Sequence, residues 1–367
     1  MTTSPDRHDE AVAKVADEGV DGLARETEGL SQGQIVRKRF RHNTAAVVSV
    51  VVLVAVILLA LTSIGFGPVP GWWQWSYTQQ PPVVDGGRPT LGLTGIGDHP
   101  FGQDNLGRDL FAMTMRGTQM TLLVMTVTGL LAGIIGVVIG ATSGYFRGWT
   151  EAILMRLTDI IIIIPLLILA AVLGRMAMTY IGRGTLQVAV LGVLIGIFAW
   201  TALARLVRAE ILSLREREFV DAARLAGAKD TRIIFKHILP NSIGVITVNL
   251  TLLLAAVVLL ETALSYLGFG VQPPDWSLGR LISANQQAFT TRPWLFWFPG
   301  LFIILICLSI NFIGDGLRDA FDPRQKKFNA KKAKETSEHM LDETDAVDQD
   351  VARSDTDGNA PGPTKPA

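Results

Sequence analysis

Apolar residues in this chain are gathered into blocks of about twenty, the length of helix that crosses the hydrocarbon core of a bilayer. Hydrophobic residues make up 49 % of the 367 residues, and the mean hydropathy is +0.35. Because a spanning segment must satisfy its own backbone hydrogen bonds in lipid, the blocks predict helices. We expect an all-α polytopic membrane protein with six transmembrane helices, at residues 44–64, 119–141, 152–173, 185–206, 243–267 and 297–313.

The distribution of Lys and Arg predicts the orientation of these helices. Both residue types are concentrated before the first block, around Arg147, at 205–237 and after Arg318, whereas the alternate loops hold few of them. Loops rich in Lys and Arg stay on the cytoplasmic side, so both termini are predicted to be cytoplasmic. The first block begins too late and is too long for a cleaved signal peptide, and we interpret it as a spanning helix.

Composition divides the chain into segments of different character. The two ends are polar and charged and cannot bury enough apolar surface to fold, so they are predicted to be disordered. The group Trp72, Trp73 and Trp75 is expected near the outer headgroups, where aromatic residues gather. The predicted segments are a disordered tail at 1–30, an interfacial elbow helix at 31–43, a first span at 44–64, an extracytoplasmic loop with a Trp-rich insertion at 65–116, a core of five spans at 117–320 that includes a cytoplasmic loop at 215–241, and a disordered tail at 325–367.

The cytoplasmic loop at 215–241 reads REREFVDAARLAGAKDTRIIFKHILPN. Its first half places Phe219, Ala222, Ala223 and Ala226 on one narrow face of a helix, and the small Ala residues make that face shallow. Gly227 stands where a left-handed helix C-cap is expected. Asp230 is then a candidate N-cap for a second short helix, which Pro240 is expected to end. The loop is therefore predicted to form helix, tight turn and helix.

The sequence of this loop resembles the EAA loop of ABC-importer permeases, in the D-A-A at 221–223, Gly227 and the I-L-P at 238–240. In that family the loop docks into a groove on a cytoplasmic ATPase. Asp221 stands where the family pattern has Glu. The alternative interpretation is a plain basic connector between membrane helices. The residues that the resemblance assigns to ATPase coupling are Phe219, Asp221, Ala222, Ala223, Gly227, Ala228, Lys229, Asp230, Ile233, His237, Leu239 and Pro240.

The resemblance extends to the C-type permease subunit of dipeptide and oligopeptide ABC importers. It is carried by HPFGQDNLGRDLFAMTMRG at 99–117, MRLTDIIIIIPLLILA at 155–170, ETALSYLGFGVQPPDWSLGRLI at 261–282 and FPGLFIILICLSINFIGDGLRDAFDPR at 298–324. GLSQGQIVRKRF at 29–40 fits the N-terminal elbow of that subunit. The chain departs from the family in the insertion at 67–97 and in the two tails.

The resemblance implies the type I ABC-importer permease (MetI-like) fold in a bacterial cell membrane. It also implies a set of partners: a B-type permease subunit that forms a heterodimer with this chain, two ATP-binding subunits, and an extracellular peptide-binding protein. The function implied is ATP-driven import of peptides, with this chain forming half of the translocation pathway. ATP and Mg would be bound by the partner subunits, and no cofactor is expected in this chain.

Signatures of catalysis are not found in the sequence. No G-x-x-x-x-G-K-[ST] occurs, so a phosphate-binding Walker A loop is missing, and no G-x-S-x-G occurs either. The five His residues lack metal-ligand spacing, and the lone Cys307 cannot build a metal cluster or an intrachain disulfide. We therefore expect a non-enzymatic chain with no catalytic residues, no metal site and no nucleic-acid partner.

Three polar residues within the apolar blocks are candidates for a substrate path, because charge in hydrocarbon is costly and is often functional. They are Glu261, Asn249 and Asp159. For Glu261 a hydrogen bond between helices is an alternative. For Asp159 the alternative is a structural ion pair with Arg156, one turn earlier.

Other functions fit parts of the sequence. The same architecture could import nickel chelates or another small solute, because a separate binding protein supplies most of the selectivity in this importer class. A stand-alone secondary transporter would need its own binding centre, usually within internal repeats, and no repeat is visible. A membrane scaffold or sensor would need a folded soluble domain at one end. Neither of the last two explains the loop at 215–241.

Overall fold

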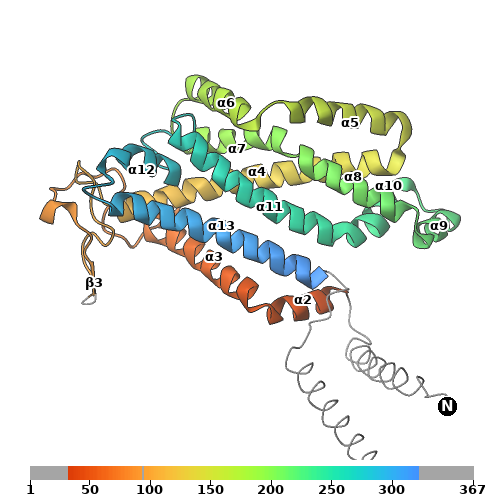
Figure 1. Cartoon of the computed structure of the whole chain (residues 1–367), viewed down its shortest axis with the longest axis horizontal. Coiled ribbons are helices and arrows are strands. Elements are labelled where there is room, and N and C mark those ends of the chain that lie inside the picture. Colours follow the sequence, from red (N-terminus) through yellow and green to blue (C-terminus); the bar gives the residue numbers. More distant parts are fainter. Residues whose placement is uncertain (1–31, 93–94, 322–367) are drawn as a thin grey trace, which may run out of the picture. The chain divides into compact units, whose positions relative to one another are not determined.

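The computed structural model describes residues 32–92 and 95–321, and within these residues the chain is almost entirely helical (Figure 1). The tails predicted to be disordered, at 1–30 and 325–367, lie outside the described residues. The helices are α2 (Gln32–His42), α3 (Thr44–Ser63), α4 (Leu110–Phe146), α5 (Gly148–Ile163), α6 (Leu166–Ile181), α7 (Thr185–Ala199), α8 (Thr201–Arg215), α9 (Glu218–Leu225), α10 (Asp230–Arg232), the π-helical turn η2 (Ile233–Ile238), α11 (Leu239–Tyr266), α12 (Leu278–Asn285) and α13 (Trp294–Phe321).

Short elements occupy the segment between α3 and α4 and the segment after α12. Two antiparallel pairs of two-residue strands are formed by β1 (Gly65–Phe66) with β2 (Val69–Pro70) and by β3 (Leu91–Gly92) with β4 (Gly95–Ile96). The 3-10 turns are η1 (Asp85–Gly87) and η3 (Gln286–Ala288).

The expected polytopic membrane fold is confirmed. Four helical stretches of the described residues are each long and apolar enough to cross a bilayer: α3, α4, the continuous stretch Asp230–Tyr266, and α13. Two further candidates are bent pairs, α5 with α6 at 80° and α7 with α8 at 42°. When each bent pair counts as one span, the described residues hold six.

Each bent pair was expected as one span, and in the structure each consists of two helices. The third span was expected at 152–173, and in the structure Pro165 separates it into two helices bent by 80°. Ile164 is extended, with φ −75° and ψ 120°, because the proline ring disfavours the helical conformation of the residue before it. The fourth span continues into the polar segment as predicted, with a bend at Trp200.

The boundary between the outer loop and the second span was predicted too late. Helix α4 begins at Leu110, within the segment 65–116 that was expected to be loop, and continues to Phe146. Its N-cap is Asp109, whose carboxylate accepts a hydrogen bond from the Ala112 backbone N–H at 2.8 Å. An N-cap carboxylate of this kind satisfies one of the free N–H groups of the first turn. The stretch before residue 117 is polar, so the sequence did not indicate that a helix starts within it.

The Trp-rich insertion packs on the start of α4. Trp73 donates its indole N–H to Asp109 at 2.9 Å, and Trp75 stacks on His99 with 5.1 Å between ring centroids. His99 Nδ1 lies 2.8 Å from the second oxygen of Asp109. Burial raises the pKa of the Asp109 carboxyl, and its hydrogen bonds from His99, the Ala112 backbone and Trp73 oppose that shift. Trp72 contacts protein as well, because its indole N–H donates to the Thr62 hydroxyl at 3.4 Å, but it is 61 % exposed, and contact with the headgroups stays a prediction for it.

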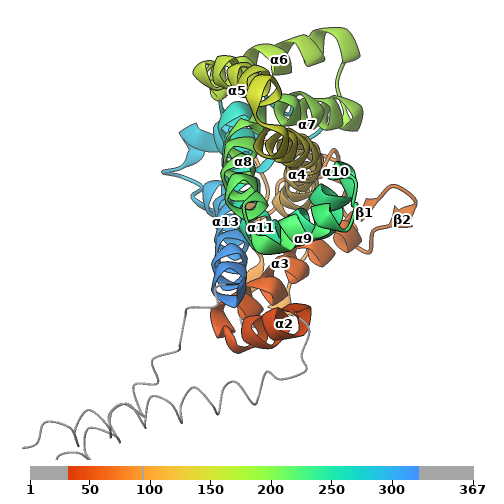
Figure 2. The ribbon, with the colours of Figure 1, turned by 90° about the vertical axis from the view of Figure 1, so that its right-hand side faces the viewer.

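The two ends of the described bundle lie on one face of it. Asn43, which caps α3, donates its side-chain amide to the Asp319 carboxylate near the end of α13 at 3.3 Å. Helix α2 packs along this end of α13, as Figure 2 shows. An even number of spans requires the two ends to meet on one side, and this contact brings them together.

Helix α4 lies at the centre of the bundle, in contact with α3, α7, α8 and α11. Its glycines allow this, because a Cβ at Gly133 would lie 3.3 Å from Leu250 of α11, and one at Gly136 would lie 3.1 Å from Leu203 of α8. At Gly140 the neighbour is backbone, because a Cβ there would lie 2.6 Å from the carbonyl oxygen of Ala204 in α8. Small residues at such positions let helix backbones approach closely in a membrane.

The contact of Gly140 with α8 gives a stability prediction. Replacing Gly by Ala inside a helix normally gains about 0.5–1 kcal/mol. At Gly140 the methyl group would overlap backbone, and overpacking of this kind costs about 1–3 kcal/mol. We expect Gly140→Ala to lower the thermal midpoint of the detergent-solubilised protein.

The matched control is Gly300→Ala in α13, where no atom of the described residues lies within 4 Å of the added Cβ. This variant should keep or raise the midpoint. Equal midpoints for the two variants would contradict the packing argument.

Candidate functional site

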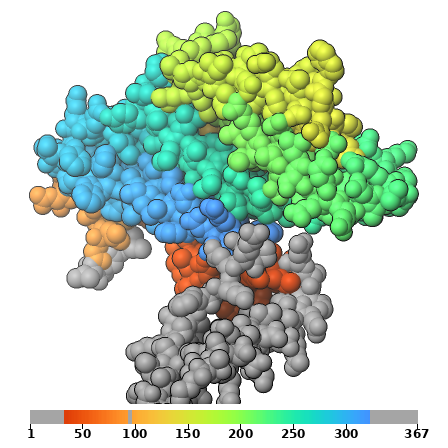
Figure 3. Space-filling view, turned by 45° about the vertical axis from the view of Figure 1, so that its right-hand side comes forward, coloured from red at the N-terminus to blue at the C-terminus, as the bar shows by residue number. Residues whose placement is uncertain are grey.

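The candidate site is the segment that joins α8 to α11. It comprises α9, a tight turn, α10 and η2, and it projects from the same end of the bundle as the end of α8 (Figure 1). In the space-filling view it forms the green end of the surface (Figure 3). The predicted order of helix, tight turn and helix is found in the structure.

Gly227 ends α9 as the sequence predicted. Its φ is +78°, in the left-handed region that favours glycine. The Gly227 N–H donates to the carbonyl of Arg224 at 2.9 Å, and the Ala228 N–H donates to that of Ala223 at 3.1 Å. These two bonds form a Schellman motif, which satisfies the last carbonyls of the helix. The turn after α9 is therefore held by its own backbone.

Two details of the second helix were predicted wrongly. Lys229, rather than Asp230, takes the N-cap position, and the Asp230 carboxylate instead accepts a hydrogen bond from the Tyr145 hydroxyl at 2.6 Å. Pro240 does not end the helix, which continues to Tyr266. The π turn explains this, because the Leu239 N–H bonds back to Ile234 and α11 then starts afresh with Pro240 in its first turn. Proline is tolerated there, since its missing N–H has no helical partner to lose.

An apolar cluster fixes the segment to the bundle. Val220, Ile233 and Ile238 are fully buried. They pack with Tyr145 of α4 and Ile211 of α8, among other residues of those helices. Burying side chains of this size contributes roughly 1.5–3 kcal/mol each. Ile233, which was predicted to contact the ATPase, therefore faces the protein's own interior.

Tyr145 is the polar centre of the same attachment. Its hydroxyl bonds to Asp230, and its backbone carbonyl accepts a hydrogen bond from the Arg215 guanidinium. The guanidinium carbons of Arg224 and Arg215 lie 5.7 and 5.9 Å from its ring centroid, within the range of cation–π attraction. Sequence reasoning missed Tyr145, although an aromatic residue at the cytoplasmic end of a span was a usable signal.

The face of α9 that points away from the bundle is open. Of the residues predicted for coupling, the exposed ones are Phe219, Asp221, Ala222, Gly227, Lys229, Asp230 and Pro240, and the half-buried ones are Ala223, Ala228, His237 and Leu239. Among the exposed large hydrophobic residues of the described chain, Leu225 has the largest exposed fraction, at 90 %. The sequence analysis did not select Leu225, because it breaks the small-residue pattern. We call the exposed parts of Phe219, Ala222 and Leu225 the α9 surface.

The three residues predicted for a substrate path do not form one site. Glu261 is fully buried and accepts hydrogen bonds from Thr121 of α4 at 2.8 Å and from Ser265 at 2.6 Å. That geometry matches the alternative of a hydrogen bond between helices. Asn249 donates to the Val245 carbonyl of its own helix at 2.7 Å. A role in a substrate path stays a prediction for both.

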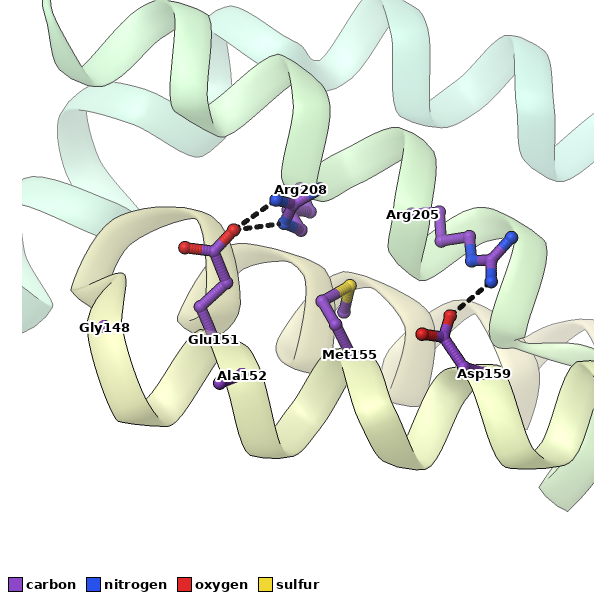
Figure 4. Close-up of a pocket in the computed structure, with 7 residues that line it drawn as sticks. All are labelled: Gly148, Glu151, Ala152, Met155, Asp159, Arg205 and Arg208. Carbon is purple, nitrogen blue, oxygen red and sulfur yellow. Dashed lines mark hydrogen bonds and ion pairs between the residues drawn. The ribbon is translucent and has the colours of Figure 1, made fainter.

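Asp159 lies elsewhere, in a cleft of about 580 Å³ between α5 and α8. Figure 4 shows its carboxylate paired with Arg205 of α8, and one further ion pair, from Glu151 to Arg208. The expected partner of Asp159 was Arg156, so this expectation was wrong about the partner. The neighbouring helix supplies the guanidinium, and spacing within a single helix could not reveal it.

Removing one hydroxyl tests how Tyr145 holds the segment. Tyr145→Phe keeps the ring and loses the bond to Asp230, which should cost about 1 kcal/mol. We expect amide hydrogen exchange across residues 216–232 to become roughly fivefold faster, since local opening controls exchange. The control is Tyr180→Phe, at a tyrosine that is 81 % exposed. Unchanged exchange in Tyr145→Phe would show that the apolar cluster alone fixes the segment.

Comparisons with known proteins identify two family models and a structural neighbour to which the chain is similar. Residues 136–327 match the family model of the binding-protein-dependent transport system inner membrane component. Residues 31–85 match the N-terminal TM domain of oligopeptide transport permease C. Among solved structures, an inward-facing form of the MetNI methionine ABC transporter aligns with a TM-score of 0.46 and 22 % identity, over 57 % of this chain and 96 % of that one.

Several curated relatives are similar over most of their length. The oligopeptide transport system permease protein OppC of Mycobacterium tuberculosis is 37 % identical over 307 residues, which cover 82 % of this chain and 97 % of that protein. OppC of Bacillus subtilis is 36 % identical, over 79 % of this chain and 88 % of that protein. A putative peptide permease of Brucella ovis is 39 % identical, over 80 % and 92 %. The chain therefore belongs to the family of binding-protein-dependent transport system inner membrane components, and it is a multi-pass inner-membrane, non-catalytic permease subunit of an ABC transporter, in which ATPase subunits are implied.

Proposed function

We propose that this chain is the C-type permease subunit of a peptide importer and forms half of its translocation pathway. Its partners in this proposal are a B-type permease subunit, two ATP-binding subunits and an extracellular peptide-binding protein. The relatives described above are named as oligopeptide or peptide permeases, which supports peptide cargo. The observation that carries the proposal is the α9 surface, an apolar face left open at the end of the bundle that is predicted to be cytoplasmic.

The exposure of Leu225 supports docking of a partner on the α9 surface. Leu225 at 90 % exposure leaves nearly its whole side chain in contact with water. Burying such a side chain gains roughly 1.5–3 kcal/mol, so a partner that covers it would be held with that free energy. Ala222 beside it is small, which lets a groove wall approach the helix. The α9 surface therefore suits insertion into a groove of an ATPase subunit.

The attachment of α9 suits transmission of force. The Schellman turn, the buried cluster around Val220 and Ile238, and the Tyr145 contacts tie α9 to α4, α8 and α11. A groove that moves when the ATPase subunits bind ATP and Mg would carry α9 with it. The three helices would then move with α9, because Val220 of α9 packs in one apolar cluster with residues of all three.

Leu225→Ser tests the docking role. We expect about tenfold less ATPase subunit to co-purify with the tagged chain, because tenfold in affinity corresponds to about 1.4 kcal/mol. The amount of the chain in the membrane should stay unchanged, since Leu225 makes little contact within the chain. Peptide-stimulated ATP hydrolysis should fall in parallel.

The matched control is Leu106→Ser, in the outer loop, where the leucine is 55 % exposed. It should leave ATPase recovery at the wild-type level. Full ATPase recovery with Leu225→Ser would argue against docking through α9. Loss of the chain from the membrane would point to misfolding instead.

Cargo is tested separately. Complete transporter, reconstituted with its binding protein, is supplied with a labelled tripeptide or with labelled nickel–histidine chelate. The proposal expects ATP-dependent accumulation of the tripeptide and only background nickel. Accumulation of nickel alone would assign the chain to a metal-chelate importer. Uptake driven by a proton gradient without ATP would favour a secondary transporter.

A further inference from the structure

Four charged side chains lie on facing sides of α5 and α8, which belong to the two bent pairs that are candidate spans. Glu151 and Asp159 come from α5, and Arg208 and Arg205 come from α8. The two ion pairs follow one another along the helices, with Met155 between them on α5, as Figure 4 shows. Arg208 also donates its Nε–H to Glu151 at 2.8 Å.

The Asp159–Arg205 pair lies further from the start of α5 than the Glu151–Arg208 pair does. Helix α5 starts at Gly148, and Asp159 is eleven residues further on, which corresponds to about 16 Å of helix at 1.5 Å per residue. Along a helix parallel to the bilayer normal, this length is roughly half of the 30 Å hydrocarbon core. Charged side chains at such a depth face the interior of a bundle or a water-filled cavity, because lipid does not solvate them.

The paired side chains remain partly exposed to solvent in this chain. The side chains of Arg205 and Asp159 are 45 % and 43 % exposed. The cleft that the pairs line has room for many water molecules, at about 580 Å³. Helix α5 itself buries only Thr158 among its described residues, so it stands off the bundle.

The other side of α5 has the opposite character. Ile153, Leu157 and Ile160 recur at helical spacing and are all exposed. At 100° per residue this stripe lies about 180° around the helix from Met155. An apolar stripe of this kind can face lipid or an apolar partner, whereas the charged side cannot.

We propose that the α5–α8 cleft is a water-filled wall of the translocation pathway in its cytoplasmic half, with the two ion pairs exposed to the passing solute. The proposal rests on the proposed function, since it assigns a face of the chain to the pathway of that permease. This wall carries charges of both signs, which suits a zwitterionic solute such as a peptide. The ammonium group of the peptide would meet a carboxylate and its carboxylate would meet a guanidinium, and each of these side chains is already neutralised by its ion-pair partner. Such contacts are weak. Weak contacts are needed along the pathway because the solute must leave it again.

Thiol accessibility tests the proposal in the assembled transporter. The chain has one cysteine, Cys307, which is buried. In a Cys307→Ala background, Met155→Cys places a thiol in the cleft. Ile153→Cys and Leu157→Cys place thiols on the apolar side, two residues before and two after. Inside-out vesicles containing all subunits are treated with a membrane-impermeant maleimide.

We expect Met155→Cys to react at least about tenfold faster than either control, because maleimides react with the thiolate, which forms in water and not in lipid. Equal rates for the three variants, or an unreactive Met155→Cys, would overturn the proposal. A thiol that reacts in the isolated chain and is protected in the complex would also overturn it, by identifying the cleft as a subunit interface.

The same vesicles are assayed for ATP-dependent peptide uptake. Uptake with an unreactive cleft rejects the water-filled wall and leaves the permease function standing. A reactive cleft without uptake of any peptide supports the wall and rejects the peptide cargo.

Discussion

The approach of α8 to α4 is the contact on which the rest of the structure depends. Within lipid, apolar side chains gain little by leaving their surroundings for one another, so helices associate through close packing and hydrogen bonds. Gly136, Gly140 and Gly144 of α4 supply that closeness, since a Cβ at each would lie within 3.1 Å of an atom of α8. With α8 fixed there, its end at Arg215 meets Tyr145 at the end of α4. The attachment of the segment between α8 and α11 thus depends on glycines of α4.

Much of the fold could be predicted from the sequence, because its main signals are local. Blocks of about twenty apolar residues predict spans, and Gly227 predicts a left-handed turn. The errors arose where a local signal met tertiary structure. Pro240 was expected to end a helix, and a π turn before it removed the need. Asp159 found its partner on another helix, and Tyr145 became important only once α4 and α8 lay together. The α9 surface could be placed from the sequence, but Leu225 could not be selected, because exposure depends on how the segment packs.

The polar groups of the described bundle divide into two kinds by their surroundings. Glu261 is enclosed and accepts two hydrogen bonds from side chains of α4 and α11, as a buried carboxyl in an apolar bundle requires. Asp159 and Arg205 are paired but open to a cleft. The first arrangement holds helices together, and the second keeps charge neutral at a surface. Residue type alone does not distinguish them, whereas burial does.

The π turn at Ile233–Ile238 links the number of residues in this stretch to the direction in which α9 points. It places one more residue in a turn than an α-helix would, and its buried ends, Ile233 and Ile238, are five residues apart. Each residue turns an α-helix by about 100°. Because the π turn accommodates one residue more than an α-helical turn, a chain one residue shorter at Ile233–Ile238 would close this turn as an α-helix and keep the direction of α9, whereas a second deletion would rotate α9 by roughly 100°. The number of residues in this stretch determines where the α9 surface points, independently of which residues they are.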